Sequence, residues 1–269
     1  MATVRTRRQR LGQHFLRDAA TARAIVAALA DEPPRVLEIG PGRGALTRPL
    51  VERFATVRAV ELDGALAAGL ARTERLEVRH ADALTADLDE LAGGGPWQVA
   101  ANLPYSVGTA IVRRLLPRHD LFTALVVMVQ HEVALRMVAP PGGRDRGLLT
   151  LEAEAWGRAS LLFTVPPERF APPPKVNSAV LRIELRPPHV PVAAIARALA
   201  LAAVAFAQRR KKIANALAAV AVAEELAAAV RSAGVDPGAR PQELGMEAWF
   251  ALALALPGTG AAPGGRGGR

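Results

Sequence analysis

The chain contains no cysteine, which excludes disulfide bonds, thiolate chemistry and cysteine-ligated zinc. It also lacks an apolar run long enough to cross a membrane, and the alanine-rich segment 193–207 is a weak candidate for contact with lipid. Acidic residues are absent from positions 1–17, although this segment carries five arginines. An arginine-rich, acid-free N-terminus is typical of a transit peptide, but a motif that begins by Gly12 leaves little to cleave. We therefore expect a globular, cytoplasmic protein.

The net charge is +9, and much of it lies in two clusters. One is the N-terminal arm, residues 1–17, and the other is the run "QRRKK" with Arg209, Arg210, Lys211 and Lys212. Clustered cations favour a nucleic-acid partner, because each neutralised phosphate releases counterions. A solvated surface from an arginine-favouring genome is the alternative, since only three of the 34 basic residues are lysine.

Short apolar runs alternate with helically spaced segments through the first two thirds of the chain. Helical spacing is found at 19–30, 45–54 and 107–116, and strands are expected at 35–39, 56–62, 76–80, 97–102 and 123–130. Such alternation predicts an α/β fold with a mostly parallel sheet covered on both faces. Two later runs, 159–165 and 178–185, are joined by a proline-rich loop and are expected to pair antiparallel at one edge of the sheet.

A change in composition predicts the domain boundary. "RPPHVP" at 186–191 suits neither helix nor strand, and the following residues to 256 are alanine-rich and helical. We expect an α/β domain over residues 1–186 and a small all-α RNA-binding domain over 187–256. The glycine-rich remainder, 257–269, is predicted to be a disordered tail.

Glycines follow the first strand of the predicted sheet. "VLEIGPGRGALT" leads from a strand through Gly40, Gly42 and Gly44 into a helix, which lets the backbone approach a ligand. Glu61 ends the next strand, where a carboxylate binds ribose hydroxyls. This pair fits S-adenosylmethionine and NAD equally well.

Asp82 follows the third strand. Its carboxylate can accept a hydrogen bond from the exocyclic amine of a bound adenine, or it can cap a following helix. The position beside Glu61 and the glycines favours the cofactor.

"NLPY" follows the fourth strand, and its chemistry suits methylation of an adenine amine. The N6 lone pair is delocalised into the ring, and two acceptors can draw it back onto nitrogen: the Asn102 side-chain oxygen and the Leu103 carbonyl. Pro104 stiffens the turn, and Tyr105 offers a ring on which the base can stack. The alternative is an ordinary strand-to-helix turn with Asn102 as a cap and Tyr105 half-buried.

Six blocks in order resemble the ribosomal RNA adenine N6,N6-dimethyltransferases. They are "LGQHFL", "EIGPGRGALT", "NLPYSVGTAIV", "VMVQHEVALRM", "RFAPPPKVNSAV" and "FAQRRKKIANAL". The resemblance implies a Rossmann-like class I methyltransferase domain with a small helical domain after it. The triple proline and the "QRRKK" segment favour the branch that acts on the small ribosomal subunit over the large-subunit branch that confers macrolide resistance.

The resemblance also implies roles for individual residues. Six positions fall where the family contacts S-adenosylmethionine: His14, Leu16, Gly40, Glu61, Asp82 and Asn102. Asn102 and Tyr105 fall where it holds the target adenine, and Phe170 falls where an aromatic ring covers the other face of the base. His14 departs from the family's usual asparagine, so a plain surface position is its alternative.

We expect in-line transfer from S-adenosylmethionine to N6, without a metal or a covalent enzyme intermediate, by a monomer bound to small-subunit ribosomal RNA in the immature 30S subunit. The target adenine must be unstacked, which suits a hairpin loop. Three alternatives remain at this stage: a large-subunit methyltransferase, a non-catalytic assembly factor and an NAD-dependent enzyme.

Overall fold

The computed structural model describes residues 14–70 and 74–256. Most of the predicted basic arm and the predicted disordered tail lie outside the described residues. The chain divides into two compact units, one of residues 1–138 and 156–187 and the other of residues 139–155 and 188–269. The predicted α/β domain included 139–155, whereas the structure groups this segment with the second unit.

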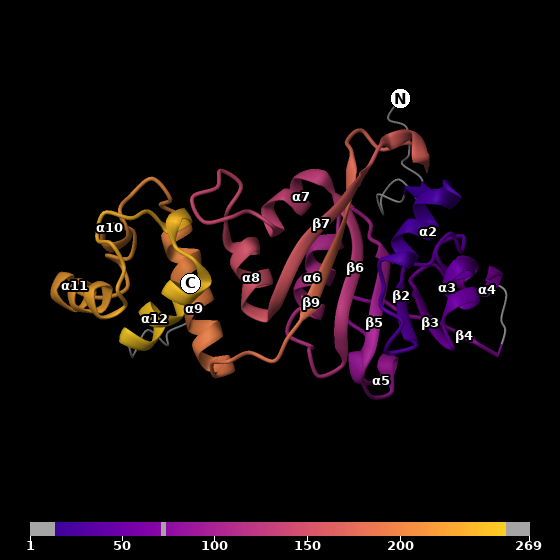
Figure 1. Cartoon of the computed structure of the whole chain (residues 1–269), viewed down its shortest axis with the longest axis horizontal. Coiled ribbons are helices and arrows are strands. Elements are labelled where there is room, and N and C mark those ends of the chain that lie inside the picture. The colour runs from indigo at the N-terminus through magenta and orange to yellow at the C-terminus, as the bar shows by residue number, and fades with distance from the viewer. Residues whose placement is uncertain (1–13, 71–73, 257–269) are drawn as a thin grey trace, which may run out of the picture. The chain divides into compact units, whose positions relative to one another are not determined.

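The first unit is built on a seven-stranded sheet with the order β4-β3-β2-β5-β6-β9-β7 (Figure 1). All seven strands were predicted, and their ends differ by two residues at most. Their bounds are β2 (Arg35–Ile39), β3 (Thr56–Glu61), β4 (Leu76–His80), β5 (Trp97–Asn102), β6 (Phe122–Gln130), β7 (Gly157–Val165) and β9 (Ser178–Leu185).

Five neighbouring strands, β4 to β6, run parallel, while β9 pairs antiparallel with both β6 and β7. The predicted parallel sheet with an antiparallel pair at one edge is therefore confirmed. The carboxyl ends of the five parallel strands meet at one edge of this sheet, which is where ligands bind in open α/β folds.

Helices connect the parallel strands. The predicted helices are shorter than expected, with α2 at Ala19–Ala27, α3 at Thr47–Arg53 and α6 at Gly108–Leu115. Asp18 is the N-cap of α2, and its carboxylate accepts the Thr21 N–H at 2.8 Å; the helix ends before the "DEPP" turn. Three further helices also belong to this unit: α4 (Gly64–Gly69), α5 (Leu88–Ala92) and α7 (His131–Met137).

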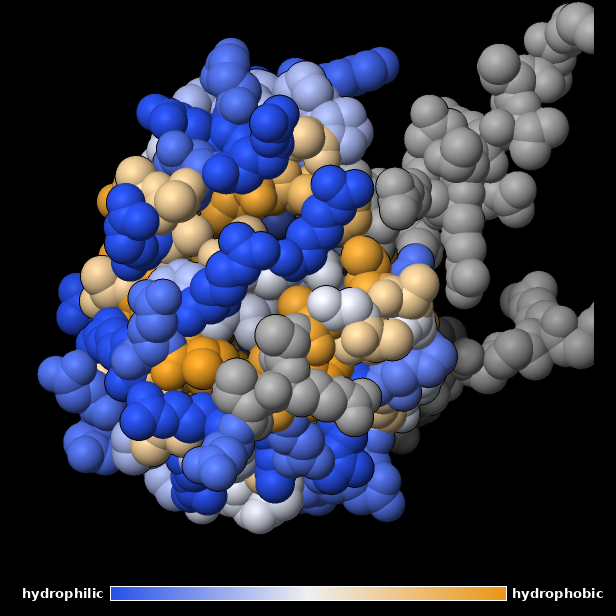
Figure 2. Space-filling view, turned by 90° about the vertical axis from the view of Figure 1, so that its right-hand side faces the viewer, coloured by the Kyte–Doolittle hydropathy of each residue, from blue (hydrophilic) through white to orange (hydrophobic). Residues whose placement is uncertain are grey.

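The sheet is buried on both faces. Val36, Val57 and Val126 share one hydrophobic cluster with Ile25 of α2 and Leu50 of α3. Successive strand residues point to opposite faces, and the residues that alternate with these valines are buried as well: Leu37, Val60, Val99, Leu125 and Val127. Runs of apolar residues without alternation are expected for such a doubly covered sheet. Figure 2 views the side of this unit with α3 and α4, where hydrophobic residues form small areas separated by hydrophilic ones.

One small sheet was missed. Strand β1 (Phe15–Leu16) pairs antiparallel with β8 (Phe170–Ala171), so the start of the described chain is tied to the loop that was expected only to join β7 and β9. This loop also holds the 3-10 helix η1 (Pro167–Arg169). Two-residue strands have no recognisable period, so they could not be predicted from the sequence.

The second unit is helical. It contains α9 (Val192–Phe206), α10 (Ile213–Ala216), α11 (Ala223–Ser232), the 3-10 helix η2 (Pro241–Glu243), α12 (Met246–Ala255) and all but the last residue of α8 (Leu148–Trp156). Buried Arg146 pairs with both carboxylate oxygens of Glu154 at 2.7 Å and donates to the Ala139 and Leu244 carbonyls. These bonds tie segment 139–155 to the turn before α12. Over the described residues, no helix is long and apolar enough to span a bilayer.

Candidate active site

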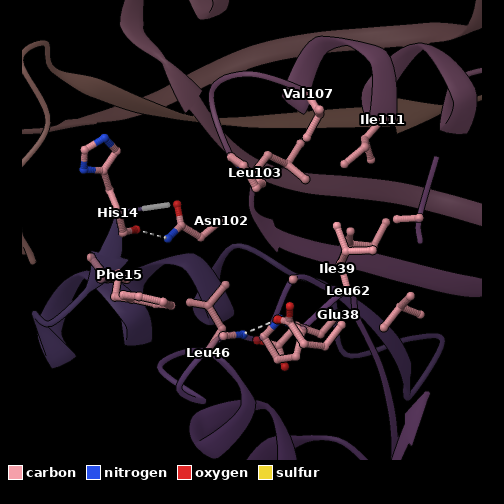
Figure 3. Close-up of a pocket in the computed structure, with 18 of the residues that line it drawn as sticks. His14, Phe15, Glu38, Ile39, Leu46, Leu62, Asn102, Leu103, Val107 and Ile111 are labelled. Atoms are coloured by element: carbon pink, nitrogen blue, oxygen red, sulfur yellow. Dashed lines mark hydrogen bonds between the residues drawn. The ribbon is translucent and has the colours of Figure 1, made fainter. Parts of the chain in front are cut away.

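A cavity of about 320 Å³ lies in the first unit where β2, β3, β4 and β5 end (Figure 3). Ten residues predicted to act in the site line it: His14, Leu16, Gly40, Gly42, Glu61, Asp82, Asn102, Leu103, Pro104 and Tyr105. The sheet brings the eight residues from Gly40 to Tyr105 together because parallel strands place their carboxyl ends at one edge. A fifth segment, made of His14 and strand β1, contributes His14, Phe15 and Leu16.

The glycine turn after β2 adopts a backbone that only glycine takes easily. Gly40 and Gly42 have φ angles of +69° and +57°. A Cβ atom on residue 42 would come within 3.0 Å of the Phe15 ring. The turn therefore keeps its backbone at the cavity wall, and a side chain at position 42 would strain it and press on Phe15.

Glu61 is held rigidly by the backbone around the cavity. One carboxylate oxygen accepts the Gly42 N–H and the other accepts the Asp63 N–H, both at 2.9 Å, and the residue is 3% exposed. Each oxygen can accept a further hydrogen bond. Glu61 thus presents two fixed acceptors at the end of β3, which suits a pair of ribose hydroxyls.

Glu38 is a second buried acid in the cavity wall, and sequence reasoning did not single it out. It is 1% exposed, and burial, reinforced by the neighbouring Glu61 charge, raises its pKa to about 8. Its Oε2 atom has no hydrogen-bond partner among the described residues. An acid inside the apolar run "VLEIG" was the available signal, since such residues are seldom fully buried.

Asp82 sits in the loop after β4 and lines the cavity. Its Oδ1 atom accepts the Leu84 N–H at 2.8 Å, which fixes the carboxylate and leaves Oδ2 outside that bond. The alternative role as a helix cap does not apply, because Asp87 caps the following helix α5.

Asn102 ends β5 and lies beside His14 (Figure 3). Its Nδ2 atom donates to the main-chain oxygen of His14 at 3.2 Å, so the amide orientation is set and Oδ1 remains as an acceptor. Asn102 does not cap α6, whose N-cap is Val107. Leu103, 2% exposed, continues the wall, and the Pro104 carbonyl closes the turn by accepting the Gly108 N–H at 2.8 Å.

Tyr105, the single tyrosine of the chain, lies at the end of the cavity beside His14. The two ring centroids are 5.3 Å apart and tilted by 36°. The Tyr105 hydroxyl shares a 2.5 Å hydrogen bond with the Ser178 hydroxyl at the start of β9. Burial raises the Tyr105 pKa, and the Ser178 bond opposes that rise. His14 Nδ1 also lies 2.8 Å from the Pro172 carbonyl oxygen, so its ring is held at the cavity rather than free on the surface.

The structure does not bring Phe170 to the cavity. Phe170 is 3% exposed, pairs with Leu16 across the β1–β8 ladder and packs in the core cluster with Val165. Residues opposite each other in an antiparallel pair share a face, so burial of Leu16 draws Phe170 inward as well. The aromatic sandwich predicted for Phe170 and Tyr105 is therefore absent from this structure.

The predicted RNA-binding cations lie in the turn between α9 and α10 of the second unit. Arg209, Arg210, Lys211 and Lys212 are all exposed. Arg209 donates to the Arg144 carbonyl oxygen at 3.0 Å, which ties the turn to segment 139–155. None of these four residues lines the cavity of the first unit.

Known proteins resemble this chain over most of its length. The chain is 41% identical over 265 residues to ribosomal RNA small subunit methyltransferase A of Synechococcus sp. (strain CC9311), with 93% of this chain and 95% of that protein covered. It is 40% identical over 251 residues to the protein of the same name from Syntrophotalea carbinolica, with 91% and 95% covered.

Two solved structures share the fold. The 23S rRNA methyltransferase ErmE matches with a TM-score of 0.67 and 30% identity, over 90% of this chain and 99% of that one. A dimethyladenosine transferase from Plasmodium falciparum matches with a TM-score of 0.72 and 20% identity, over 90% and 96% of the two chains. The predicted class I methyltransferase fold, a Rossmann-like sheet followed by a helical region, is confirmed.

A family model described as ribosomal RNA adenine dimethylase matches residues 4–256, nearly the whole chain. The match confirms three predictions: the family, the reaction as N6,N6-dimethylation of adenine in ribosomal RNA, and S-adenosylmethionine as methyl donor. An NAD-dependent enzyme and a non-catalytic factor are thereby set aside. This chain belongs to the ribosomal RNA adenine dimethylase family.

Proposed function

We propose that this protein transfers methyl groups to N6 of two adjacent adenines in a hairpin loop of small-subunit ribosomal RNA, during assembly of the 30S subunit. The observation that carries the proposal is the convergence in one cavity of two fixed carboxylates, Glu61 and Asp82, with the oriented amide of Asn102 and the Tyr105 ring. The relatives named for the small subunit are 40–41% identical to this chain, against 30% for the 23S enzyme.

The cavity fits S-adenosylmethionine in size and chemistry. A volume of about 320 Å³ suits a nucleoside with a short side chain. The Glu61 oxygens would hold the ribose hydroxyls, and Asp82 would hold the adenine amine. Leu62, which is 44% exposed, and Ile111 offer apolar surface to the adenine ring. Bound there, the cofactor supplies an electrophilic methyl group on a sulfonium.

Asn102 activates the acceptor amine. Its Oδ1 would accept an N6 hydrogen and, with the Leu103 carbonyl, draw the lone pair out of conjugation with the ring. The Nδ2–His14 bond holds the amide so that the oxygen, not the nitrogen, serves as that acceptor. Because these acceptors are already in place, they need no reorganisation during the reaction. Such preorganisation is the usual source of electrostatic rate enhancement. Proton loss follows attack, because the alkylated amine is acidic, and no strong general base is required.

Tyr105 would support the flipped base by stacking, a contact worth about 1–3 kcal/mol. Its ring plane is set by the Ser178 hydrogen bond at one end and by its fixed turn at the other. In this chain the His14 ring, 5.3 Å from Tyr105, is the aromatic neighbour that Phe170 was expected to be. His14 therefore takes part in shaping the acceptor end of the cavity.

The exposed cations Arg209, Arg210, Lys211 and Lys212 would bind the RNA backbone. The acidic lining of the cavity itself, with Glu61 and Asp82, would repel phosphate, so the two tasks need separate surfaces. We further propose that the protein works as a monomer, since one chain supplies every cavity residue, and in the cytoplasm, where its RNA is assembled.

The test compares two substrates. Purified protein with S-adenosylmethionine is incubated with unmethylated 30S and 50S precursors in parallel, and each RNA is digested and analysed for dimethyladenosine by mass spectrometry. Dimethyladenosine in the 30S sample alone, at two adjacent positions, is the expected result. Product only in the 50S sample would replace the proposal with a large-subunit activity, and an Asn102→Ala protein serves as the control for contaminating methyltransferase.

A further inference from the structure

Arg114, on α6, holds the loop after β4 from behind. Its Nη1 atom donates to the Ala83 carbonyl oxygen at 2.7 Å, and its Nη2 atom donates to the Ala86 carbonyl oxygen. The side chain is partly buried. A planar guanidinium presents such donors in a rigid fork, so the two carbonyls it joins are fixed relative to each other.

The loop that Arg114 grips is the part of the cavity nearest Asp82. Ala81, Asp82, Ala83 and Leu84 all line the cavity. Within the loop, the Asp82 main-chain oxygen accepts the Thr85 and Ala86 N–H groups at 3.0 Å and 2.8 Å. Arg114 thus fixes two carbonyl groups of this loop. Ala83 directly follows Asp82, and Ala86 donates its N–H to the Asp82 main-chain oxygen.

The same helix forms the adjacent wall. Val107 at the N-cap and Ile111 line the cavity, and Arg114 lies three residues beyond Ile111. Positions 107, 111 and 114 repeat at helical spacing and so share one face of α6. Figure 3 shows Val107 and Ile111 on the side of the cavity opposite Glu38 and Leu62. One helix face therefore both walls the cavity and anchors its Asp82 loop.

We infer that Arg114 is a positioning residue for the adenine end of the cofactor site. The inference rests on the proposed function of the cavity, and it assigns to Arg114 the task of keeping the Asp82 carboxylate where an adenine amine can reach it. Arg114 does not line the cavity, so it would act on a ligand only through the loop that it holds. Its loss affects how tightly the cofactor is held and leaves the methyl-transfer step, which depends on Asn102, unchanged.

Calorimetry with S-adenosylhomocysteine and with adenosine tests this role without RNA. Arg114→Ala removes charge-assisted hydrogen bonds to two carbonyls, and we expect both ligands to bind about tenfold more weakly. Adenosine lacks the amino-acid part, so an equal loss for the two ligands assigns the effect to the nucleoside end. Arg114→Lys, which keeps the charge, recovers part of the affinity. Arg113→Ala, which removes a charge from the same helix, is the matched control and retains wild-type affinity.

Kinetics and a double-mutant cycle separate positioning from other roles. The Arg114→Ala enzyme is expected to keep the wild-type kcat at saturating S-adenosylmethionine. Its KM for S-adenosylmethionine is expected to rise about tenfold. Because Arg114 acts through Asp82, Arg114→Ala costs little further affinity once Asp82→Ala is present. Additive losses, an unchanged affinity, or a fall in kcat at unchanged KM would each overturn the inference. Should Arg114→Ala fail to fold, the cycle is run with Arg114→Gln, and the same outcomes decide.

The outcomes also distinguish this inference from the function on which it rests. If the wild-type protein binds neither S-adenosylhomocysteine nor adenosine, the proposed cofactor site is wrong. If the wild-type protein binds both and Arg114→Ala binds them equally well, the site stands and only the role of Arg114 is lost.

Discussion

The cavity of the first unit and the basic turn of the second present charge in opposite ways. In the cavity, Glu61 is 3% exposed and both of its oxygens accept backbone N–H groups. In the turn, Arg210, Lys211 and Lys212 extend into solvent. A buried, hydrogen-bonded acid acts through its fixed position, whereas exposed cations act through charge density, which tolerates movement and responds to salt.

The contrast implies different responses to mutation. A conservative change in the cavity replaces an acceptor at a site where geometry is set by several bonds, so its effect is large and insensitive to ionic strength. A change in the turn removes one of several similar charges, so its effect is smaller and depends on salt. The four predictions below test this contrast, from the largest expected effect to the smallest.

Asn102→Ala is expected to lower kcat by about 10²–10³-fold, the usual cost of removing one fixed transition-state hydrogen bond. Single-turnover methylation of 30S precursor measures this directly. The thermal unfolding midpoint serves as the control for folding and should change little. Full methyl transfer by the variant would refute the role given to this amide.

Glu61→Gln is expected to weaken binding of S-adenosylmethionine by about tenfold to a hundredfold. The glutamine amide nitrogen must face either the Gly42 or the Asp63 N–H, and two donors then oppose each other. Calorimetry at low and high salt should give the same loss. Asp31→Asn, at a side chain that is 92% exposed, is the control and should bind normally. A loss that disappears in high salt would contradict the assignment of Glu61 to fixed geometry.

Replacing Arg210, Lys211 and Lys212 together by alanine is expected to weaken RNA binding about tenfold at moderate salt. The slope of log affinity against log salt should fall by about two, since each phosphate contact contributes about 0.7 on single-stranded RNA. Arg209 is kept because it bonds to the Arg144 carbonyl. Filter binding with a ribosomal RNA fragment measures the slope, and Arg231→Ala is a single-charge control. An unchanged slope would remove this turn from the RNA interface.

Glu38→Gln is expected to change how Tm varies with pH. The difference in Tm between this variant and the wild type should change by a few degrees between pH 4.5 and 8. The Glu38 pKa is about 8 in the folded protein against an ordinary value of 4.5, so between these values the unfolded chain releases the proton that the folded chain keeps. The free energy of unfolding is therefore highest, as far as Glu38 affects it, below pH 4.5, and this contribution is lost as pH rises towards 8.

Glutamine cannot ionise, so the difference in Tm between Glu38→Gln and the wild type should grow as pH rises through that window. Calorimetric scans at three pH values across it measure the trend. A constant difference would show that Glu38 is already ionised in the folded protein. Either result sharpens the contrast, because the exposed cations of the turn should show no such dependence.

Much of the site was predictable because its residues follow strands that the sequence marks clearly. Gly40, Glu61, Asp82 and Asn102 each come at or just after an apolar run, and parallel strands bring such positions to one edge. Tyr105 was predicted to line the site because it belongs to the same "NLPY" turn as Asn102. The roles of these residues in binding and catalysis remain predictions, while their common lining of one cavity is observed.

The failures share a different cause. Phe170 was expected to cover one face of the target adenine, but its pairing with Leu16 buries it. The Ser178 bond to Tyr105 spans 73 residues, and the grip of Arg114 on Ala83 spans 31. No local period or motif records contacts at such separations. Segment 139–155 was likewise assigned to the first domain, because nothing in its composition signals that buried Arg146 ties it to the second.

The sequence by itself determined the order of strands and helices, the glycine turn and the polar residues at the strand ends, because these depend on local backbone preference and on alternation along each segment. Only the tertiary structure decided which way Asn102 points, what holds Tyr105 and the Asp82 loop, and whether Phe170 reaches the cavity. Those outcomes depend on packing between segments far apart in the chain, where each side chain must satisfy its hydrogen bonds and bury its apolar surface in competition with all the others.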